Sequence, residues 1–513
     1  MATSRFQQIL RDLFCAIFAL LYLWISWLCI REPQIVPLST LKIIGWALAA
    51  GGFCLVIYHI LYKREYQKVR SLGKANNDIR NLFIFFLLYL PVQIYIASQM
   101  YSVEGTSWDF NVVAGYAMEY AKCEDVSNYR ELMRGTPAAM YFTRWPNNIP
   151  LYLLLGKIFR LCYSWKVSLN AVGIALNIIA IDLSLIFMYF SVRKVSKVSA
   201  TAATSLLLAA LHVPLLVYVP IYYTDTLTLP FPILGFYLWL KVKEEIGKEK
   251  FSKAYIYAVA LAVILGAGAV LKLSVIFFLI AAVIDGLVSL PIKKGILLAW
   301  AVLAIGIGVY CILNQACMNS NMVVSDEEDG YIPKLHWVMM GLQGKGNYYD
   351  PDYQLTLSVP EEGRDELVKT MIKIRLENYG FKGMVDHLYK KISFVWAEGT
   401  YYSSLKIDRD RAHPTWMDTY VNWLGDRFTP YAEYCQGVLL INLISFVAVA
   451  ISVLMHKPKR NQLLLVALIS IFGIFLFECI WEARSRYIFN YLPVFLTVTC
   501  AGWGNILNKK KNN

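Results

Sequence analysis

Long runs of apolar residues recur along this chain and limit what it can fold into. They occupy residues 12–30, 41–62, 81–101, 167–192, 198–221, 226–241, 253–271, 273–290, 295–314, 436–455, 462–481 and 487–507. A helix needs about 18–20 apolar residues to cross a bilayer, so these runs predict about twelve membrane-spanning helices. Hydrophobic residues make up 58% of the chain and charged residues only 17%, which is too little charge for a soluble surface. The sequence therefore predicts an all-α polytopic membrane protein.

Lysine and arginine cluster in the loops between these runs. All the clusters fall on one side of the membrane if both termini are cytoplasmic, as the bias of basic residues toward cytoplasmic loops requires. The clusters are Lys63, Arg64, Lys68, Arg70, Lys74 and Arg80; Arg193, Lys194 and Lys197; Lys241, Lys243, Lys248, Lys250 and Lys253; Lys293 and Lys294; Lys457, Lys459 and Arg460; and Lys509 to Lys511. Because they explain the net charge of +13, no nucleic-acid partner is expected. We expect a multi-pass protein of the plasma membrane.

Two long segments remain on the outer side and divide the chain into four parts. Residues 1–80 are expected to form an N-terminal helical hairpin followed by a basic cytoplasmic loop. Residues 81–314 form a transmembrane module whose first outer loop is 102–166. Residues 315–435 form an extracytoplasmic domain of mixed secondary structure, and residues 436–513 form the C-terminal transmembrane helices.

The first outer loop begins with SWDFNVVAGYAMEYAK, residues 107–122. Apolar residues recur there at helical spacing, so residues 110–122 predict an amphipathic helix on the membrane surface. Asp109 precedes this helix and lies close to the outer face. It either caps the helix, a role that Asp often takes, or provides a carboxylate for chemistry. Later in the loop, the apolar stretch 149–163 is too short to cross the bilayer, so we expect an interfacial or re-entrant segment.

The motif YFTRWPNNIPLYLLL, residues 141–155, leads into that interfacial stretch. It places Arg144 and Trp145 at the level of the lipid headgroups. An Arg at this level can hold a lipid phosphate, and Trp145 is a candidate substrate contact. The alternative is an ordinary aromatic belt with one basic residue, which occurs at many membrane interfaces.

Two further outer turns carry cations between apolar runs. Lys272 lies in AVLKLSVIFF, where a lone Lys is costly unless it is paired, functional or snorkelling. Arg484 and Arg486 lie in ECIWEARSRYIFNYLP, residues 478–493. Together with Arg144, these cations fall on the side of Asp109, although basic residues are otherwise biased inward. We therefore predict that an anionic group, such as a donor phosphate, binds opposite Asp109.

Helical spacing within residues 478–493 separates the charged side chains. Glu478, Glu482 and Arg486 follow at intervals of four residues, so Glu482 and Arg486 are expected to pair on one helix face. Arg484 then has no local partner and is the best anion-binding candidate. If the helix is broken here, both arginines can instead reach one phosphate.

A last outer turn contains YYTDTLTLPFPIL, residues 222–234. Its Asp225 either orients a sugar hydroxyl or a cation, or caps the following helix, and capping is slightly favoured. The candidate substrate contacts of the whole chain are Tyr222, Tyr223, Asp225, Trp145 and Glu482.

These motifs, with HWVMMGLQGKGNYYDPDY at 336–353 and FVWAEGTYY at 394–402, resemble membrane glycosyltransferases of the GT-C superfamily. The similarity is to bacterial, Gram-positive-like members related to protein O-mannosyltransferases and aminoarabinose transferases, and it covers residues 81–507. The resemblance implies a GT-C-like fold and an inverting transferase that moves a sugar from a polyprenyl-phosphate donor to a cell-envelope glycan or lipid. It implies that Asp109 is the catalytic base on the extracytoplasmic face.

The resemblance leaves the need for a metal open. Some members of the superfamily hold a divalent ion with an Asp-x-Asp motif, and the first outer loop contains no convincing one. We therefore expect no cofactor, with a divalent metal as the alternative because Glu124 and Asp125 are adjacent in this loop.

Two other functions fit the same pattern. A polysaccharide polymerase or ligase also combines many helices with a large late outer loop, and it uses lipid-linked oligosaccharides. A membrane transporter often has twelve spans with both ends inside. However, transporters usually show two similar halves and polar sites at the midplane, and neither is recognisable here. The early Trp-Asp-Phe sequence favours the glycosyltransferase.

Overall fold

The computed structural model describes residues 4–72, 77–100, 108–407 and 414–508. These residues form helices joined by loops and contain no β-strand. The all-α prediction is confirmed, whereas the prediction of mixed secondary structure in the outer domain is wrong for its described part. The described part of that domain contains helices and loops only. Lys74, Lys509 to Lys511 and the start of the first outer loop lie outside the described residues.

Within the described ranges, eight helices are long and apolar enough to cross a membrane. They are α1 (Arg5–Arg31), α2 (Thr40–Leu72), α3 (Asp78–Met100), α8 (Leu169–Ser196), α13 (Phe251–Leu271), α15 (Ile292–Met318), α20 (Phe428–Leu454), and α21 (Leu465–Ile480) with the preceding turn η4 (Lys459–Leu464). Each coincides with one of the predicted spans.

The four other predicted spans, 198–221, 226–241, 273–290 and 487–507, do not form single long apolar helices. They contain α9 (Ser199–Leu211), α10 (Pro214–Val217), α11 (Thr224–Leu227), α12 (Pro230–Gly247), η2 (Leu273–Val275), α14 (Ile276–Ser289), η5 (Ser485–Tyr491) and α22 (Leu492–Leu507). Proline accounts for two of the interruptions, because Pro214 and Pro230 begin new helices and lack the N–H that a continuing helix needs. The predicted number of about twelve spans is therefore supported for eight of them.

The first two helices belong to the bundle and do not form a separate hairpin. Both α1 and α2 pack mainly against α20, and α2 also packs against α9. Gln436 in α20 donates from Nε2 to the carbonyl oxygen of Cys29 in α1 at 2.7 Å. Lys42 in α2 pairs with Glu433 of α20 at 3.3 Å. Helices α1 and α2 are thus attached to the C-terminal part of the chain.

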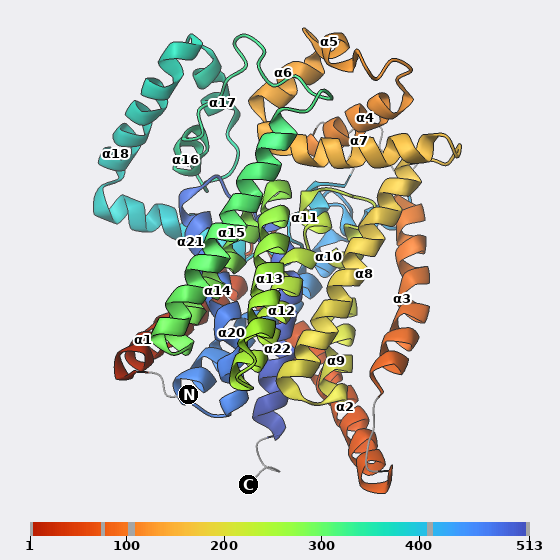
Figure 1. Cartoon of the computed structure of the whole chain (residues 1–513), viewed down its shortest axis with the longest axis vertical. Helices are drawn as coiled ribbons and strands as arrows, with labels where there is room; N and C mark the ends of the chain where they lie inside the picture. The colour runs from red at the N-terminus through yellow and green to blue at the C-terminus, as the bar shows by residue number, and fades with distance from the viewer. Residues whose placement is uncertain (1–3, 73–76, 101–107, 408–413, 509–513) are drawn as a thin grey trace.

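One end of the bundle is covered by the first outer loop. The loop contains α4 (Asp109–Lys122), α5 (Tyr129–Met133), α6 (Pro137–Arg144), η1 (Pro146–Asn148) and α7 (Ile149–Tyr163). α4 confirms the predicted amphipathic helix, and it packs against α7. Figure 1 shows α7 lying across the end of the bundle and not along it. This orientation agrees with an interfacial position for residues 149–163, and the exposed side chain of Leu161 fits it as well.

The outer domain stands beyond the same end of the bundle (Figure 1). Its described helices are α16 (His336–Gly341), α17 (Asp350–Leu357), α18 (Glu361–Trp396), η3 (Ser403–Leu405) and α19 (Asp418–Val421). Gly380 divides α18 with a φ of 52° and a ψ of −165°, a conformation that glycine adopts readily. The second half of α18 thereby returns the chain toward the bundle.

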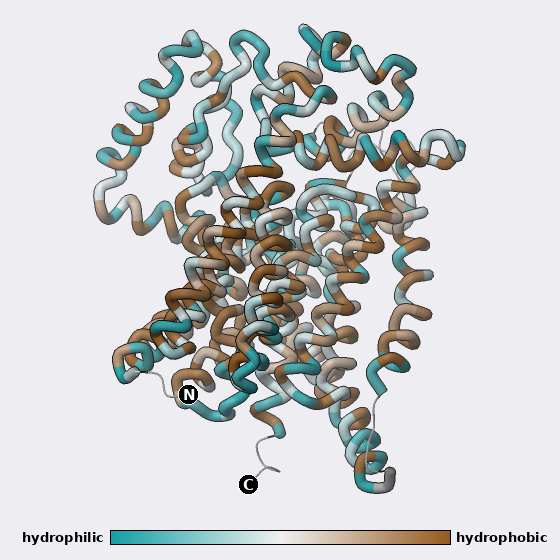
Figure 2. Tube along the Cα trace, viewed as in Figure 1, coloured by the Kyte–Doolittle hydropathy of each residue, from teal (hydrophilic) through white to brown (hydrophobic). Residues whose placement is uncertain are grey.

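Hydropathy follows this arrangement. Figure 2 shows hydrophobic residues prevailing along the bundle and hydrophilic residues prevailing in the outer domain. The start of α1 and the end of α22 lie at the end of the bundle opposite to the outer domain (Figure 1).

Candidate functional site

Asp225 lies at the centre of a buried cluster of charges. It belongs to α11, and only 1% of the residue is exposed. Its Oδ1 accepts a hydrogen bond from Lys272 Nζ at 2.5 Å, and its Oδ2 accepts one from Arg486 Nη1 at 3.0 Å. The N-cap positions of α11 and α12 are held by Tyr223 and Leu229. The favoured prediction that Asp225 caps a helix is therefore wrong, because its side chain is turned toward two cations.

Lys272 is paired and does not snorkel. It lies between α13 and η2, and its side chain retains 12% exposure. Burial alone acts to raise the pKa of Asp225, but the nearby Lys272 ammonium and Arg486 guanidinium hold that pKa below its ordinary value. Asp225 therefore stays ionised, and three segments that are distant in sequence meet on one carboxylate.

Asp109 lies beside this cluster and is much more open. It is the first residue of α4, after Trp108 at the N-cap position, and α4 has no side-chain cap. The capping alternative for Asp109 is thus wrong. Its Oδ2 lies 3.9 Å from Arg486 Nη2, and its side chain retains 34% exposure, compared with 2% for Asp225.

A chain of hydrogen bonds orients the carboxylate of Asp109. Tyr141 donates from its hydroxyl to Asp109 Oδ1 at 3.0 Å. Asn148 donates from Nδ2 to the Tyr141 hydroxyl at 2.6 Å, and Tyr223 donates from its hydroxyl to Asn148 Oδ1 at 2.7 Å. Since Asn148 occupies the acceptor side of the Tyr141 oxygen, the proton of Tyr141 is directed at Asp109. Burial and the Asp109 charge raise the pKa of Tyr141, so it remains a donor.

Trp108 and Lys406 complete the group, and the sequence analysis missed both of them. Lys406 Nζ lies 4.2 Å from the centroid of the Trp108 ring, and the guanidinium carbon of Arg486 lies 5.3 Å from the same centroid. Burial, followed by the charges of Arg486 and Arg484, lowers the pKa of Lys406 well below its ordinary value. The available signal was a single Lys that follows the aromatic sequence WAEGTYY in the outer segment.

Helical spacing predicted the wrong arginine as the partner of Glu482. Residues 481–484 are not helical, so the expected pairing of Glu482 with Arg486 is wrong. Arg484 donates from Nε to Glu482 Oε1 at 3.1 Å, and Tyr487 donates from its hydroxyl to Glu482 Oε2 at 2.6 Å. Arg486 instead faces Asp225. The helix is broken here, and the expectation that both arginines then reach one phosphate stays a prediction.

The outer domain holds the segment that carries these arginines. The backbone N–H of Glu482 donates to the carbonyl of Trp337 at 2.9 Å, and that of Ala483 donates to the carbonyl of Gly346 at 2.8 Å. Gly341 approaches the same segment so closely that a Cβ there would lie 2.7 Å from the carbonyl carbon of Trp481. The position of Arg484 is therefore tied to the loop between α16 and α17.

Glu398 fixes the loop before Lys406. Its carboxylate accepts from the backbone N–H groups of Thr400 and Tyr402 at 2.8 and 2.6 Å, and from the hydroxyl of Ser485 at 2.6 Å. Sequence reasoning did not select Glu398, although it is an acid between apolar residues in FVWAEGTYY. This buried carboxylate joins the Lys406 loop to η5.

Arg144 and Trp145 lie next to the cluster and contact a different partner. Arg144 donates from Nη1 to the hydroxyl of Tyr353 at 2.9 Å, and Trp145 stacks on the ring of Tyr353 at 5.7 Å. Trp145 also lies 4.9 Å from the ring of Tyr141. Both residues thus connect the first outer loop to α17, and Arg144 does not join the cations around Asp225.

Tyr222 differs from Tyr223 in its surroundings. It is fully buried, and its ring packs edge-on to Phe110 at 4.8 Å. The same ring fills the space that a Cβ at Gly173 would occupy, at 2.5 Å. Tyr222 therefore packs α4 and α8 together, whereas Tyr223 reaches the site through Asn148.

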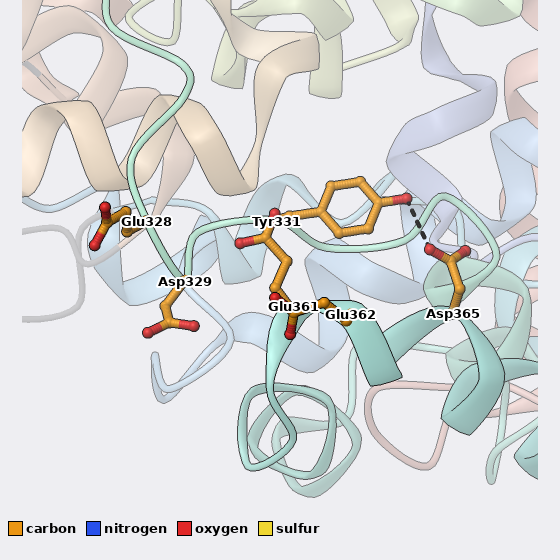
Figure 3. Close-up of a pocket in the computed structure, with 6 residues that line it drawn as sticks. All are labelled: Glu328, Asp329, Tyr331, Glu361, Glu362 and Asp365. Atoms are coloured by element: carbon orange, nitrogen blue, oxygen red, sulfur yellow. Dashed lines mark hydrogen bonds between the residues drawn. The ribbon is translucent and has the colours of Figure 1, made fainter.

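A separate acidic hollow lies in the outer domain, with a volume of about 510 Å³ (Figure 3). It is lined by Glu328, Asp329, Tyr331, Glu361, Glu362 and Asp365. Tyr331 donates from its hydroxyl to Asp365 Oδ2 at 3.2 Å, as Figure 3 shows.

Among the described residues, no three His, Cys, Asp or Glu side chains are arranged to hold a metal ion. In the cluster itself, Asp225 is already occupied by two cations.

Comparison with known proteins gives a family for nearly the whole chain. Residues 2–506 match the family described as "Conserved hypothetical integral membrane protein". No curated protein and no solved structure matches the chain significantly. The protein therefore lies in a lipid bilayer, which it crosses several times. The chain belongs to this family of integral membrane proteins.

Proposed function

We propose that this protein is an inverting glycosyltransferase of the extracytoplasmic face. It transfers a sugar from a polyprenyl-phosphate donor to a hydroxyl of a cell-envelope glycan or lipid. The observation that carries the proposal is the pairing of an accessible carboxylate, Asp109, with buried cations at the end of the bundle that bears α7. The resemblance of the motifs to GT-C transferases supports the same reaction.

Asp109 has the properties of a general base. Its side chain is partly exposed, so an acceptor hydroxyl can approach it, and Tyr141 fixes the direction of one oxygen. In the reaction, the acceptor oxygen forms a bond to the anomeric carbon while the bond from that carbon to the phosphate oxygen breaks. The acceptor proton passes to Asp109, and the electron pair leaves with the lipid phosphate.

The leaving phosphate gains negative charge, and fixed cations stabilise that charge. Arg486 is suited to this task because Asp225 holds one of its nitrogens while another lies near Asp109. Lys272 is engaged by Asp225, so it sets the position of that carboxylate. The phosphate of a lipid donor is found at the membrane surface, which is the level implied by the interfacial helix α7.

The test is transfer by the purified full-length protein in lipid nanodiscs. Radiolabelled polyprenyl-monophosphate hexose is supplied with extracted envelope glycans and glycolipids as acceptors. Asp109→Asn is expected to reduce transfer by about 10²–10⁴-fold, which is the usual contribution of a general base. The matched control is Glu124→Gln, an exposed acid of the same loop, which should leave transfer unchanged. Equal transfer by wild type and Asp109→Asn overturns the assignment.

A second set of donors separates this proposal from its nearest rival. Turnover of diphosphate-linked oligosaccharides without turnover of monophosphate sugars indicates a polymerase or ligase. Turnover of the monophosphate donor, with inversion at the anomeric carbon in the product, supports the transferase.

A further inference from the structure

The cations of this site differ in their partners. Asp225 is shared by Lys272 and Arg486, and Glu482 accepts from Arg484. Asp109 lies beside Arg486. Lys406 differs from these three cations, because no ion pair joins it to a carboxylate among the described residues.

Lys406 has no acidic partner among the described residues. Its ammonium contacts two aromatic rings, with 4.2 Å to the centroid of Trp108 and 5.9 Å to that of Tyr402. An aromatic face attracts a cation but does not neutralise it. The charged groups that act on Lys406 include two that repel it, Arg486 and Arg484, and two with a smaller effect that attract it, Asp109 and Asp225.

The ammonium is held in this position by the fold. Lys406 follows η3, and the loop before η3 is fixed because Glu398 accepts from the backbone of Thr400 and Tyr402. Glu398 also accepts from Ser485, next to Arg484 and Arg486. The fold therefore keeps the partly exposed Lys406 near two other cations, and like charges held close together repel one another. An anion that enters the site removes this repulsion.

We propose that Lys406 binds the anionic oxygens of a phosphate group that enters beside Trp108. The cation–π contact with Trp108 positions the Lys406 ammonium before the phosphate binds. Arg486 lies on the same ring and supplies the second contact to the phosphate. The identity of the ligand as a lipid-linked phosphate rests on the proposed function, whereas the phosphate site itself rests on the cluster.

The proposal separates the roles of two lysines. Lys272 is paired with Asp225 at 2.5 Å, so its loss should mainly lower stability. Lys406 has no such partner, so its loss should mainly lower the affinity for phosphate. This difference gives an experiment that a purely structural role of Lys406 does not satisfy.

The experiment measures binding by the full-length protein in nanodiscs, without any sugar transfer. The probes are a long-chain polyprenyl monophosphate, the uncharged polyprenol and inorganic phosphate. The variants are Lys406→Met, Lys406→Gln and Lys406→Arg, with Lys382→Met as a matched control because Lys382 is exposed on α18. Thermal midpoints show which variants are folded, and the Gln variant replaces the Met variant if that one does not fold.

The expected result is a Kd for polyprenyl monophosphate that rises at least about tenfold in Lys406→Met and Lys406→Gln. Lys406→Arg and Lys382→Met should stay within about twofold of wild type, and polyprenol binding should not change. Competition by inorganic phosphate at similar concentration identifies a free phosphate as the source. Wild-type affinity in both neutral variants overturns the proposal. The failure of Asp109-dependent transfer, with binding that still depends on Lys406, overturns the proposed function alone.

Discussion

Lys272 Nζ lies 2.5 Å from Asp225 Oδ1, where the turn after α13 meets the short helix α11. Asp225 is buried and Lys272 is nearly so, and Arg486 approaches Asp225 from a third segment. Removing one partner from such a group leaves an uncompensated buried charge, which costs about 3–5 kcal/mol. We therefore expect Asp225→Asn to lower the thermal midpoint of the purified protein strongly. Combining it with Lys272→Met should restore part of the loss, and a midpoint that does not change in Asp225→Asn contradicts this role.

The hydroxyl of Tyr141 should matter for transfer more than for folding. Its removal in Tyr141→Phe takes away the donor to Asp109, and a hydrogen bond to a charged group contributes about 1.5–3 kcal/mol. Transfer is expected to fall by about 10–100-fold, mainly in kcat. Tyr223→Phe is the control, because it removes a hydroxyl of the same chain that does not touch Asp109. Equal losses in both variants indicate a general loosening of the site.

Arg144 should be less important than its sequence position suggested. Since Arg144 is bonded to Tyr353 of α17, Arg144→Ala is expected to reduce transfer by less than about fivefold, the effect of one neutral-partner hydrogen bond. Kinetics at saturating donor test this. A loss as large as that of Asp109→Asn places Arg144 at the phosphate after all.

Acid should destabilise the outer domain through His336. Burial lowers the pKa of this imidazole from 6.5 to about 4, and its Nδ1 lies 2.8 Å from Thr356 Oγ1. Between these two pKa values the unfolded chain binds a proton that the native chain does not, so stability falls as the pH falls. The loss amounts to about 2–3 kcal/mol by pH 4.5. Thermal midpoints from pH 7 to pH 4.5 should decline less steeply in His336→Gln, and parallel curves contradict the assignment.

Gly341 should not accept a side chain. A Cβ at this position would lie 2.7 Å from the carbonyl carbon of Trp481 and 2.8 Å from the carbonyl oxygen of Ile480. Because both are backbone atoms, Gly341→Ala must displace the segment before Arg484. The thermal midpoint should fall by several degrees, equivalent to about 1–3 kcal/mol. Gly115→Ala in α4 is the control, since nothing lies within 4 Å of its Cβ position, and it should be neutral.

The sequence was sufficient for the long helices and for the first outer loop. Apolar runs such as 12–30 and 436–455 have one dominant solution in a bilayer, because every backbone N–H and C=O must be bonded within the segment. The amphipathic pattern after Asp109 likewise predicted α4. Apolar runs that contain proline were ambiguous. The run 198–221 looks continuous in composition, yet Pro214 divides it.

The charge pairs of the site could not be predicted from spacing. Glu482 and Arg486 are four residues apart, but the chain leaves the helix after Ile480, so proximity in sequence no longer sets proximity in space. The partner of Arg486 is Asp225, which is contributed by another segment. Lys406 was missed for a related reason. Its neighbours Trp108 and Arg486 come from two other segments, and no local pattern connects them.

The backbone bonds from Glu482 and Ala483 to Trp337 and Gly346 have a consequence for protein engineering. Because only backbone groups form these hydrogen bonds, many side chains around them can be exchanged as long as the backbone conformation is preserved. An outer domain grafted from another member of the family should therefore be functional only if its backbone can form the same two hydrogen bonds. If these backbone bonds are preserved, the outer domain can be exchanged as a module while the charged groups beneath it stay in register.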